Sequence, residues 1–158
     1  MRRMWWVIAV VAVVVVIATY LTWLAARVDR LHARASAAYA TLDAHLVRRA
    51  AAAVALAEAA QLPTLMYAAR IALDAAPDDR EVAENDLTRH LRTVDGAPPD
   101  FLDQLVQVSR RVALARQVHN DVVRDALAVR RRPLIRVFRL ARKHPRPAYF
   151  DVDDPSLT

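Results

Sequence analysis

The sequence predicts an all-α protein, in which an N-terminal transmembrane helix continues into an elongated antiparallel helical bundle. An uncharged apolar run fills Met4–Ala26, apolar residues then recur every three or four positions, and no stretch alternates apolar and polar residues as a strand would. We therefore expect three parts. Residues 1–26 form a transmembrane anchor, 27–132 a helical bundle, and 133–158 a basic amphipathic segment with a C-terminal tail.

The apolar run is long enough to cross a membrane. Its 23 residues would extend roughly 34 Å as a helix, against about 30 Å for the hydrocarbon core. Aromatic residues that favour the headgroup level stand near both ends. The predicted anchor residues are Met4, Trp5, Trp6, Tyr20, Trp23 and Ala26. A cleaved signal peptide is the alternative, because Arg2 and Arg3 precede the run, but signal h-regions usually span only about 7 to 15 residues.

Periodicity predicts that the anchor helix continues unbroken to the residues before Pro63. The apolar face of this continuation comprises Val28, Leu31, Ala35, Tyr39, Leu42, Leu46, Ala50, Ala53, Ala57 and Ala60. A shorter helix is expected from Pro63 to Pro77. Asp78-x-x-Glu81 then forms a candidate capping box for a third helix, which Gly96 should end.

The last long helix is expected from about Pro99 to Arg132. Its apolar seam alternates steps of four and three, a spacing suited to antiparallel partner helices. The seam comprises Phe101, Leu105, Val108, Val112, Ala115, His119, Val122, Ala126 and Val129. We interpret His119 as a core or boundary histidine that is satisfied by a helix partner, rather than as a proton shuttle.

The composition argues against the common catalytic sites. The chain has no cysteine and a single glycine, so thiol chemistry and glycine-rich phosphate loops cannot be built. Glu81 and Glu84 lack the following histidine of a carboxylate-bridged metal site, and Asp86 with His90 is one isolated pair. The serines, which are Ser36, Ser109 and Ser156, have no neighbouring base to activate them. We predict no catalytic residue, metal or cofactor, and hence no enzyme.

Positive charge is concentrated near the C-terminus. The net charge of +6 comes from 22 Arg and one Lys against 17 acids, although arginine richness can also reflect a GC-rich genome. In "PLIRVFRLARK", Pro133–Lys143, a helical stripe should contact anionic lipids at the membrane surface through Arg132, Arg136, Arg139 and Lys143. One alternative is a solvated helix end with Phe138 in the core. A second is nucleic-acid binding, which we favour less because no recognition motif accompanies the cluster.

Three segments together resemble the LemA family. The first is Ala38-Tyr39-x-x-Leu42-Asp43-x-x-Leu46-x-Arg48-Arg49, the second is "ALARQVHNDVV" with Arg116, Asn120 and Val123 on family positions, and the third is "RPAYFDVDD" with Tyr149, Phe150 and Asp151. Glu84–Leu87 is a weaker match between them. Two departures are that residues 51–56 lack the family's proline and asparagine, and that His119 replaces its tyrosine. The resemblance implies a single N-terminal anchor, an elongated helical bundle and no assigned enzymatic activity.

Helix geometry predicts how the charges of the first motif lie. At about 100° per residue from Tyr39, Asp43 lies only about 40° from the centre of the apolar face, whereas Arg48 points directly away and Arg49 lies at the boundary. A half-buried carboxylate needs a cation. None stands one turn away on the same helix, so we expect Arg116 of the last long helix to pair with Asp43.

These observations predict a LemA-like single-pass protein of the cell membrane that acts as a non-enzymatic scaffold or interaction module. Its partners would be the bilayer, with anionic lipids, other membrane proteins or self-association as further possibilities. A membrane-tethered nucleic-acid-binding protein is one alternative, and an enzyme whose catalytic groups assemble across helices is another. Arginines flank the run on both sides, so the positive-inside rule alone leaves the orientation close to a tie. The C-terminal cluster favours a cytoplasmic bundle.

Overall fold

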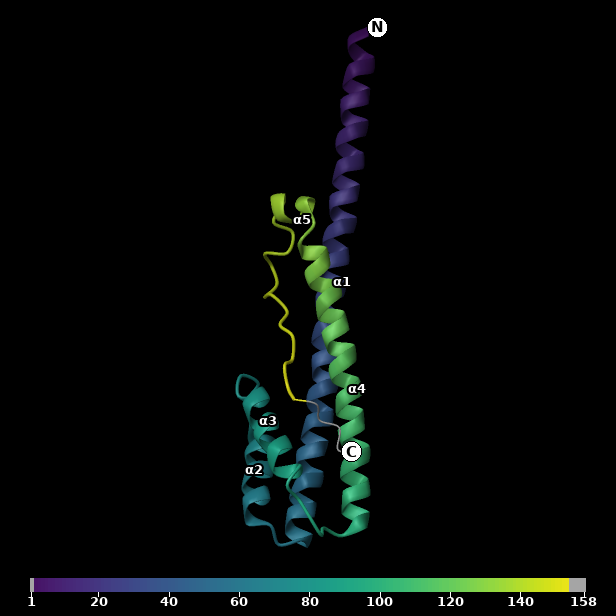
Figure 1. Ribbon diagram of the computed structural model, residues 1–158. Helices are drawn as coiled ribbons and strands as arrows, with labels where there is room; N and C mark the ends of the chain where they lie inside the picture. The colour runs from purple at the N-terminus through teal and green to yellow at the C-terminus, as the bar shows by residue number, and fades with distance from the viewer. Residues whose placement is uncertain (1, 154–158) are drawn as a thin grey trace. The chain divides into compact units, whose positions relative to one another are not determined.

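The computed structural model describes residues 2–153, with the side chains from residue 4 onward, and every regular element in this part of the chain is an α-helix (Figure 1). The all-α prediction is therefore confirmed. The helices are α1 Arg2–Ala59, α2 Pro63–Asp74, α3 Arg80–Leu91, α4 Pro99–Arg130 and α5 Pro133–Val137. Residues 154–158 of the predicted tail, with Ser156, lie outside the described residues.

The chain divides into two compact units. Unit 1 is drawn from Met1–Ala35 and Val122–Pro147, and unit 2 from Ser36–Asp121 and Ala148–Thr158. Helix α1 runs through both without a break, as the periodicity predicted. The boundaries predicted at residues 26 and 132 stay a prediction.

Two helix ends use a left-handed residue other than glycine. At the end of α1, Gln61 has a φ of 55°, and the Leu62 N–H donates to the Ala57 carbonyl at 2.9 Å. At the end of α5, Arg139 has a φ of 52°, and the Leu140 N–H donates to the Ile135 carbonyl at 3.1 Å. Both are Schellman-type closures, which satisfy carbonyls that the helix itself leaves without a donor.

The closure at Arg139 corrects one prediction. The segment Pro133–Lys143 is not one amphipathic helix, because α5 ends at Val137 and turns follow. Arg132, Arg136, Arg139 and Lys143 are all exposed, but they do not form a single helical stripe.

The start and end of α3 also differ from the prediction. The helix begins at Arg80 after Asp79, one residue later than the proposed capping box requires, and no side chain caps it. The Glu81 carboxylate instead accepts the Asp151 N–H at 3.1 Å. The helix ends at Leu91, so Gly96, with a φ of 71°, supplies a left-handed residue to the following loop rather than the end of the helix.

Alanine supplies seven of the twelve buried residues in the larger core cluster of unit 2. Leucines from α1, α2, α3 and α4 fill the space between the alanines. The buried members of this cluster are Ala50, Ala52, Ala53, Leu56, Ala57, Leu65, Ala69, Ala72, Ala83, Leu87, Leu91 and Leu105. A second cluster joins Leu42, Leu46 and Val112 to Phe150 and Val152 of the C-terminal segment. The predicted apolar seams of both long helices are buried or half-buried throughout.

Candidate functional site

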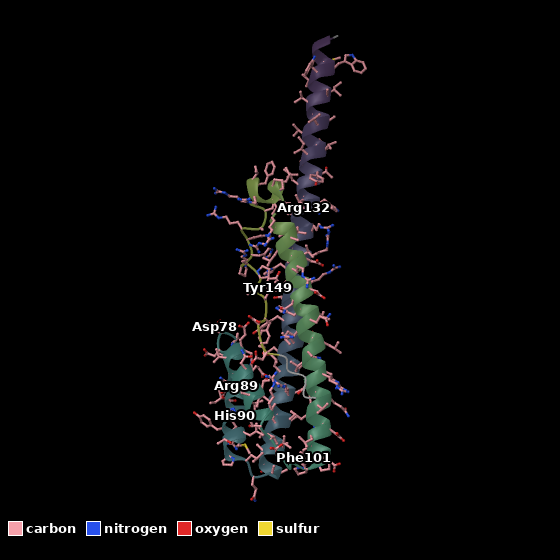
Figure 2. The ribbon with its side chains drawn as sticks, viewed as in Figure 1. Asp78, Arg89, His90, Phe101, Arg132 and Tyr149 are labelled. Atoms are coloured by element: carbon pink, nitrogen blue, oxygen red, sulfur yellow. The ribbon has the colours of Figure 1, made fainter. Side chains whose placement is uncertain are left out.

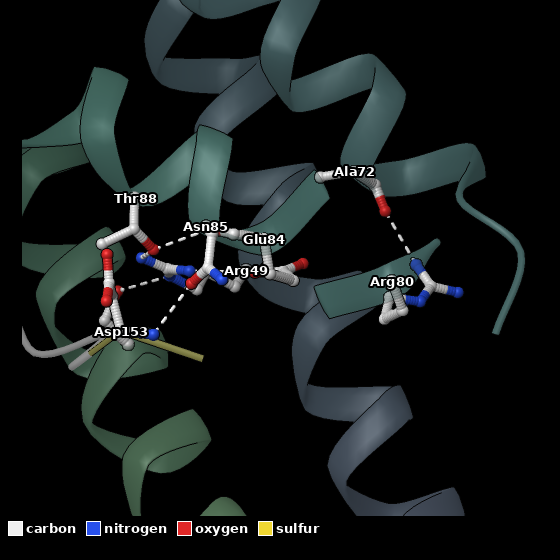
Figure 3. Close-up of polar contacts among 8 residues, drawn as sticks. Arg49, Ala72, Arg80, Glu84, Asn85, Thr88 and Asp153 are labelled. Atoms are coloured by element: carbon white, nitrogen blue, oxygen red, sulfur yellow. Dashed lines mark hydrogen bonds and ion pairs between the residues drawn. The ribbon is translucent and has the colours of Figure 1, made fainter. Parts of the chain in front are cut away.

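The centre of unit 2 holds a fully buried ion pair. The Arg49 and Glu84 side chains are both 0% exposed, and Arg49 Nη1 lies 2.9 Å from Glu84 Oε2. Arg49 Nη2 also donates to Thr88 Oγ1 at 2.9 Å (Figure 3). Its Nε donates to Ser109 Oγ at 3.2 Å. Arg49 therefore links α1 to α3 and α4. The prediction that it lies at the boundary of the apolar face is wrong, because α3 covers that flank of α1.

Burial and pairing shift the pKa values of Arg49 and Glu84 in opposite directions. Burial raises the pKa of Glu84 above its usual 4.5, while the charge of Arg49 and its hydrogen bond to Glu84 work to lower it. Arginine stays protonated in proteins, so its guanidinium always presents a charge to the carboxylate. Neither group faces solvent, and the pair holds helices together rather than offering a reactive site.

Asp43 pairs with a cation on another helix, but not with the predicted one. Its Oδ1 lies 3.2 Å from Arg80 Nη2 of α3. Arg80 also donates to the Ala72 carbonyl at 2.7 Å, which ties α2 to α3 (Figure 3). Arg116 does not pair with Asp43, because it donates to the carbonyl of Val152 in the C-terminal segment. Arg48 is exposed, as the helix geometry predicted.

The structure brings most of the LemA-like residues of unit 2 to one place. Tyr39, Leu42 and Leu46 of α1 pack around Phe150, whose ring lies edge-on to Tyr39 with 6.4 Å between centroids. Arg116 and Asn120 of α4 bind the backbone of the same C-terminal segment. No sequence signal other than the resemblance connected these positions.

His119 is buried beside Tyr39, with 5.7 Å between ring centroids. Its Nε2 lies 3.3 Å from the Ala148 carbonyl. A carbonyl only accepts, so this nitrogen must carry the proton of a neutral ring. Burial lowers the pKa of His119 below 6.5, although the hydrogen bond to Ala148 opposes the shift. One ring nitrogen of His119 is thus bonded to the C-terminal segment rather than to a helix, whereas Nδ1 is buried with no hydrogen-bond partner among the described residues.

In unit 1 the segment after α4 is held against α1. Leu24 and Val28 pack with Val129 and Ile135, and Leu24 is only 1% exposed. Arg130 anchors the same segment by donating to three carbonyls, those of Ala141, His144 and Pro145. His144 Nε2 also lies 2.7 Å from Asp29 Oδ1 of α1.

From Met4 to Trp23 the apolar side chains of α1 are exposed, apart from Leu21, which is half-buried. Among the described residues, one helix, α1, is long and apolar enough to cross a membrane, and only 6% of its most apolar 18-residue stretch is buried. Trp5 and Trp6 are exposed at one end, and Tyr20 and Trp23 at the other. The predicted anchor residue Ala26 is instead half-buried in unit 1.

Exposed apolar side chains accompany the arginines of unit 1. Leu134, Val137 and Phe138 are all exposed, and Val137 is 73% exposed. Phe138 is therefore exposed, whereas the alternative of a solvated helix end required it to lie in the core. Arg132 lies between the end of α4 and the start of α5 (Figure 2).

A groove of about 870 Å³ lies along α2 and α3. Exposed Tyr67, Ile71 and Val82 line it together with Arg70 and Asp79. Ser109, for which the sequence predicts no activating base, is buried and its hydroxyl accepts a hydrogen bond from Arg49. Among residues 4–153, no three histidine or acidic side chains gather as metal ligands would.

No protein-family model, characterised protein or solved structure matches the chain.

Proposed function

We propose that the chain is a LemA-like single-pass protein of the cell membrane, whose helices form an elongated antiparallel bundle that acts as a non-enzymatic scaffold or interaction module. One observation carries the proposal. The apolar side chains of α1 are exposed up to Trp23, apart from half-buried Leu21, and the next residue, Leu24, is buried by the α4–α5 region. The stretch from Met4 to Trp23 is 20 residues, or roughly 30 Å of helix, which matches a hydrocarbon core.

The contacts within each unit support the antiparallel bundle. In unit 2, Tyr39 lies against His119 while Arg49 binds Ser109, so later residues of α1 meet earlier residues of α4. The buried pair of Arg49 and Glu84 then fixes α3 against α1. The groove along α2 and α3, which exposed Tyr67, Ile71 and Val82 line, offers an apolar surface for another protein.

Cysteine labelling tests the membrane span and its orientation. The chain has no native cysteine, so Ser36→Cys and Thr19→Cys each introduce a single thiol. Ser36 is exposed beyond the span, whereas Thr19 lies inside it. An impermeant thiol reagent should label Ser36→Cys from one side of intact membranes, the cytoplasmic side in our proposal. Thr19→Cys should react only after solubilisation.

Two results would contradict the span. Equal labelling of Thr19→Cys before and after solubilisation would place the segment in water. An intact mass lacking the N-terminal residues would identify a cleaved signal sequence. Ser109, which would otherwise be a natural site for the probe, is unsuitable because it is buried and binds Arg49.

We also propose that the α5 region contacts the membrane surface. Leu134, Val137 and Phe138 are exposed close in sequence to Ile135, which packs on Leu24 at the end of the span. Exposed Arg132, Arg136, Arg139 and Lys143 add attraction to anionic headgroups, at about 1 kcal/mol for each residue near the surface. The apolar side chains favour a lipid surface over the nucleic-acid alternative, since phosphate contacts alone do not need them.

An environment-sensitive fluorophore on Val137→Cys, in vesicles containing anionic lipid, tests this contact. Its emission should shift to the blue and be quenched by lipid-borne quenchers, and replacing Arg136, Arg139 and Lys143 by Gln should weaken both effects. The control is Gln104→Cys, an exposed site on α4 in unit 2. Identical spectra at Val137 and Gln104 would refute the contact.

A further inference from the structure

The C-terminal strap, which we define as residues 148–153, is bound through its backbone by side chains of α3 and α4. The Phe150 N–H donates to Asn120 Oδ1 at 2.9 Å, and the Phe150 carbonyl accepts from Asn120 Nδ2 at 3.1 Å. A primary amide that pairs with both backbone groups of one residue reproduces the hydrogen bonds that a neighbouring β-strand would make. The strap is therefore recognised as an extended peptide.

Three more side chains continue the pattern on both sides of the strap. From α3, Glu81 accepts the N–H of Asp151 at 3.1 Å, and Asn85 accepts the N–H of Asp153 at 2.8 Å (Figure 3). From α4, Arg116 donates to the Val152 carbonyl.

The spacing of these side chains matches an extended chain. Glu81 and Asn85 are one turn apart on α3, as Arg116 and Asn120 are on α4, and one helical turn rises about 5.4 Å. Two residues of a strand rise about 6.6 Å, so successive turns of each helix meet alternate residues of the strap.

The strap also presents its side chains as a strand does. Phe150 and Val152 are each 4% exposed, whereas Tyr149, Asp151 and Asp153 are exposed. The two buried side chains pack on an apolar surface formed by Tyr39, Leu42, Leu46, Val112 and Ala115. The site thus reads a backbone and a Phe-x-Val pattern together, the combination by which proteins bind extended peptides.

We propose that this strap groove, formed by the four backbone-binding side chains and the apolar surface beneath Phe150 and Val152, is a peptide-binding site that accepts the strap of a second copy of this chain as well as its own. Among the described residues, 148–153 make the contacts that define the strap, and the residues that lead to it, 138–147, contain no helix. Exchange of an identical element between copies needs no new contact. The inference goes beyond the proposed membrane function and does not depend on it.

The strap of the same chain has the advantage of a high local concentration, so a free peptide should bind only weakly while that strap is intact. Phe150→Ala removes the side chain that fills the groove without shortening the chain. We would titrate the full-length Phe150→Ala chain in detergent with a fluorescent synthetic peptide that carries the sequence of residues 146–153. Binding should be saturable and about tenfold or more tighter than to the unaltered chain.

Two controls define the specificity of the binding. A peptide with Ala at the Phe150 position should bind about tenfold or more weakly. Adding Asn120→Ala to the acceptor chain should weaken binding similarly, while Gln117→Ala, at an exposed position of the same helix, should leave it unchanged. The absence of saturable binding up to millimolar peptide, in an acceptor that keeps its helical circular dichroism, would overturn the proposal. So would equal affinity for the two peptides.

Cysteine cross-linking gives a test without Phe150→Ala, in case that variant unfolds. A chain with Asn85→Cys and a chain with Asp153→Cys are mixed after brief partial unfolding and are then oxidised. A disulfide between the two chains, at a yield well above that of Gln104→Cys with Asp153→Cys, supports exchange. A single chain that carries both Asn85→Cys and Asp153→Cys is the positive control, because a disulfide within it shows that the two positions can be joined. If this disulfide forms within one chain but never between two chains, the proposal is overturned.

Discussion

The charged side chains of Arg49 and Glu84 are both buried away from water. The protein tolerates this burial because the two charges pair with each other. Burial of an ion pair is costly, and hydrophobic replacement of both partners is often neutral or stabilising. Removal of one partner is different, because it leaves the other charge buried and unpaired. Thr88 and Ser109 accept two further hydrogen bonds from the guanidinium.

Arg49→Met should therefore destabilise the protein by about 3 to 5 kcal/mol, and Glu84→Leu by a similar amount. The double variant should lose much less than the sum, because no unpaired charge remains. Denaturant unfolding followed by circular dichroism in detergent would measure all three variants. Losses that simply add would show that the two charges do not stabilise each other.

Asp43 should couple energetically to Arg80 and not to Arg116. Asp43 is about one-third exposed, so Asp43→Asn should cost about 1 kcal/mol or less. Arg80→Ala should cost more, because it also removes the bond to the Ala72 carbonyl. In double-mutant cycles the Asp43 and Arg80 losses should be non-additive. Coupling of Asp43 to Arg116 instead would contradict the observed pairing.

Single-helix geometry predicted some of these residues and missed others for a definable reason. It placed Asp43 near the apolar face and Arg48 in solvent, and both predictions are confirmed. Arg49 lies about 80° from the same face centre, and it is buried because α3 covers that side. The position of a second helix is not contained in the periodicity of the first. For the same reason the sequence predicted Arg116 as the partner of Asp43, whereas the observed partner is Arg80.

At the scale of elements, proline marked the helix starts better than glycine marked the ends. Pro63, Pro99 and Pro133 each begin a helix, as a residue with a fixed φ and no N–H favours. Gln61 and Arg139 end helices in the left-handed conformation. The sequence does not predict these helix ends, because such positions usually carry glycine or asparagine. For this reason the sequence predicted one helix over Pro133–Lys143, although α5 ends at Val137.

The strap should loosen in acid because of His119. Its pKa in the folded protein lies below 6.5 as a result of burial, so a released His119 binds protons more readily. The stability that depends on the neutral ring is present above about pH 6.5 and is lost as the pH falls through the lowered value. Hydrogen-exchange protection at Phe150 and Asp151 should fall between about pH 7.5 and about pH 5.5.

His119→Gln should reduce this pH dependence, because an amide still donates to the Ala148 carbonyl but does not titrate. His32 also has a pKa lowered by burial, but it belongs to unit 1 and is present in both proteins. The informative quantity is therefore the difference between the two proteins. Equal loss of protection in both would exclude His119 as the cause.

At the scale of the whole chain, the uninterrupted α1 was predictable and its division between units was not. Periodicity showed that the helix continues past the apolar run, and α1 does extend to Ala59. Hydropathy placed the end of the anchor at Ala26, yet Leu24 belongs to the core of unit 1. A leucine facing lipid and a leucine facing another helix are equally apolar, so composition alone does not separate them.

Truncation should reveal which residues unit 1 requires. A fragment of residues 27–158 lacks Leu24, so Ile135 loses one of its packing partners and the end of α4 should lose hydrogen-exchange protection. A fragment of residues 20–158 should restore that protection, and both fragments should be predominantly helical by circular dichroism. Equal protection of residues 126–135 in the two fragments would show that Leu24 contributes little.

The alanine core of unit 2 has a consequence for the mutations that it can accept. Ala53, Ala57, Ala69 and Ala72 are almost completely covered, and an alanine side chain has no rotamer to lose on folding and none to adjust afterwards. A larger residue at these positions cannot turn aside, so the helices themselves must separate. Substitutions that enlarge a residue should therefore be more harmful here than those that remove a methyl group, and variation should be confined to Gly, Ala and Ser.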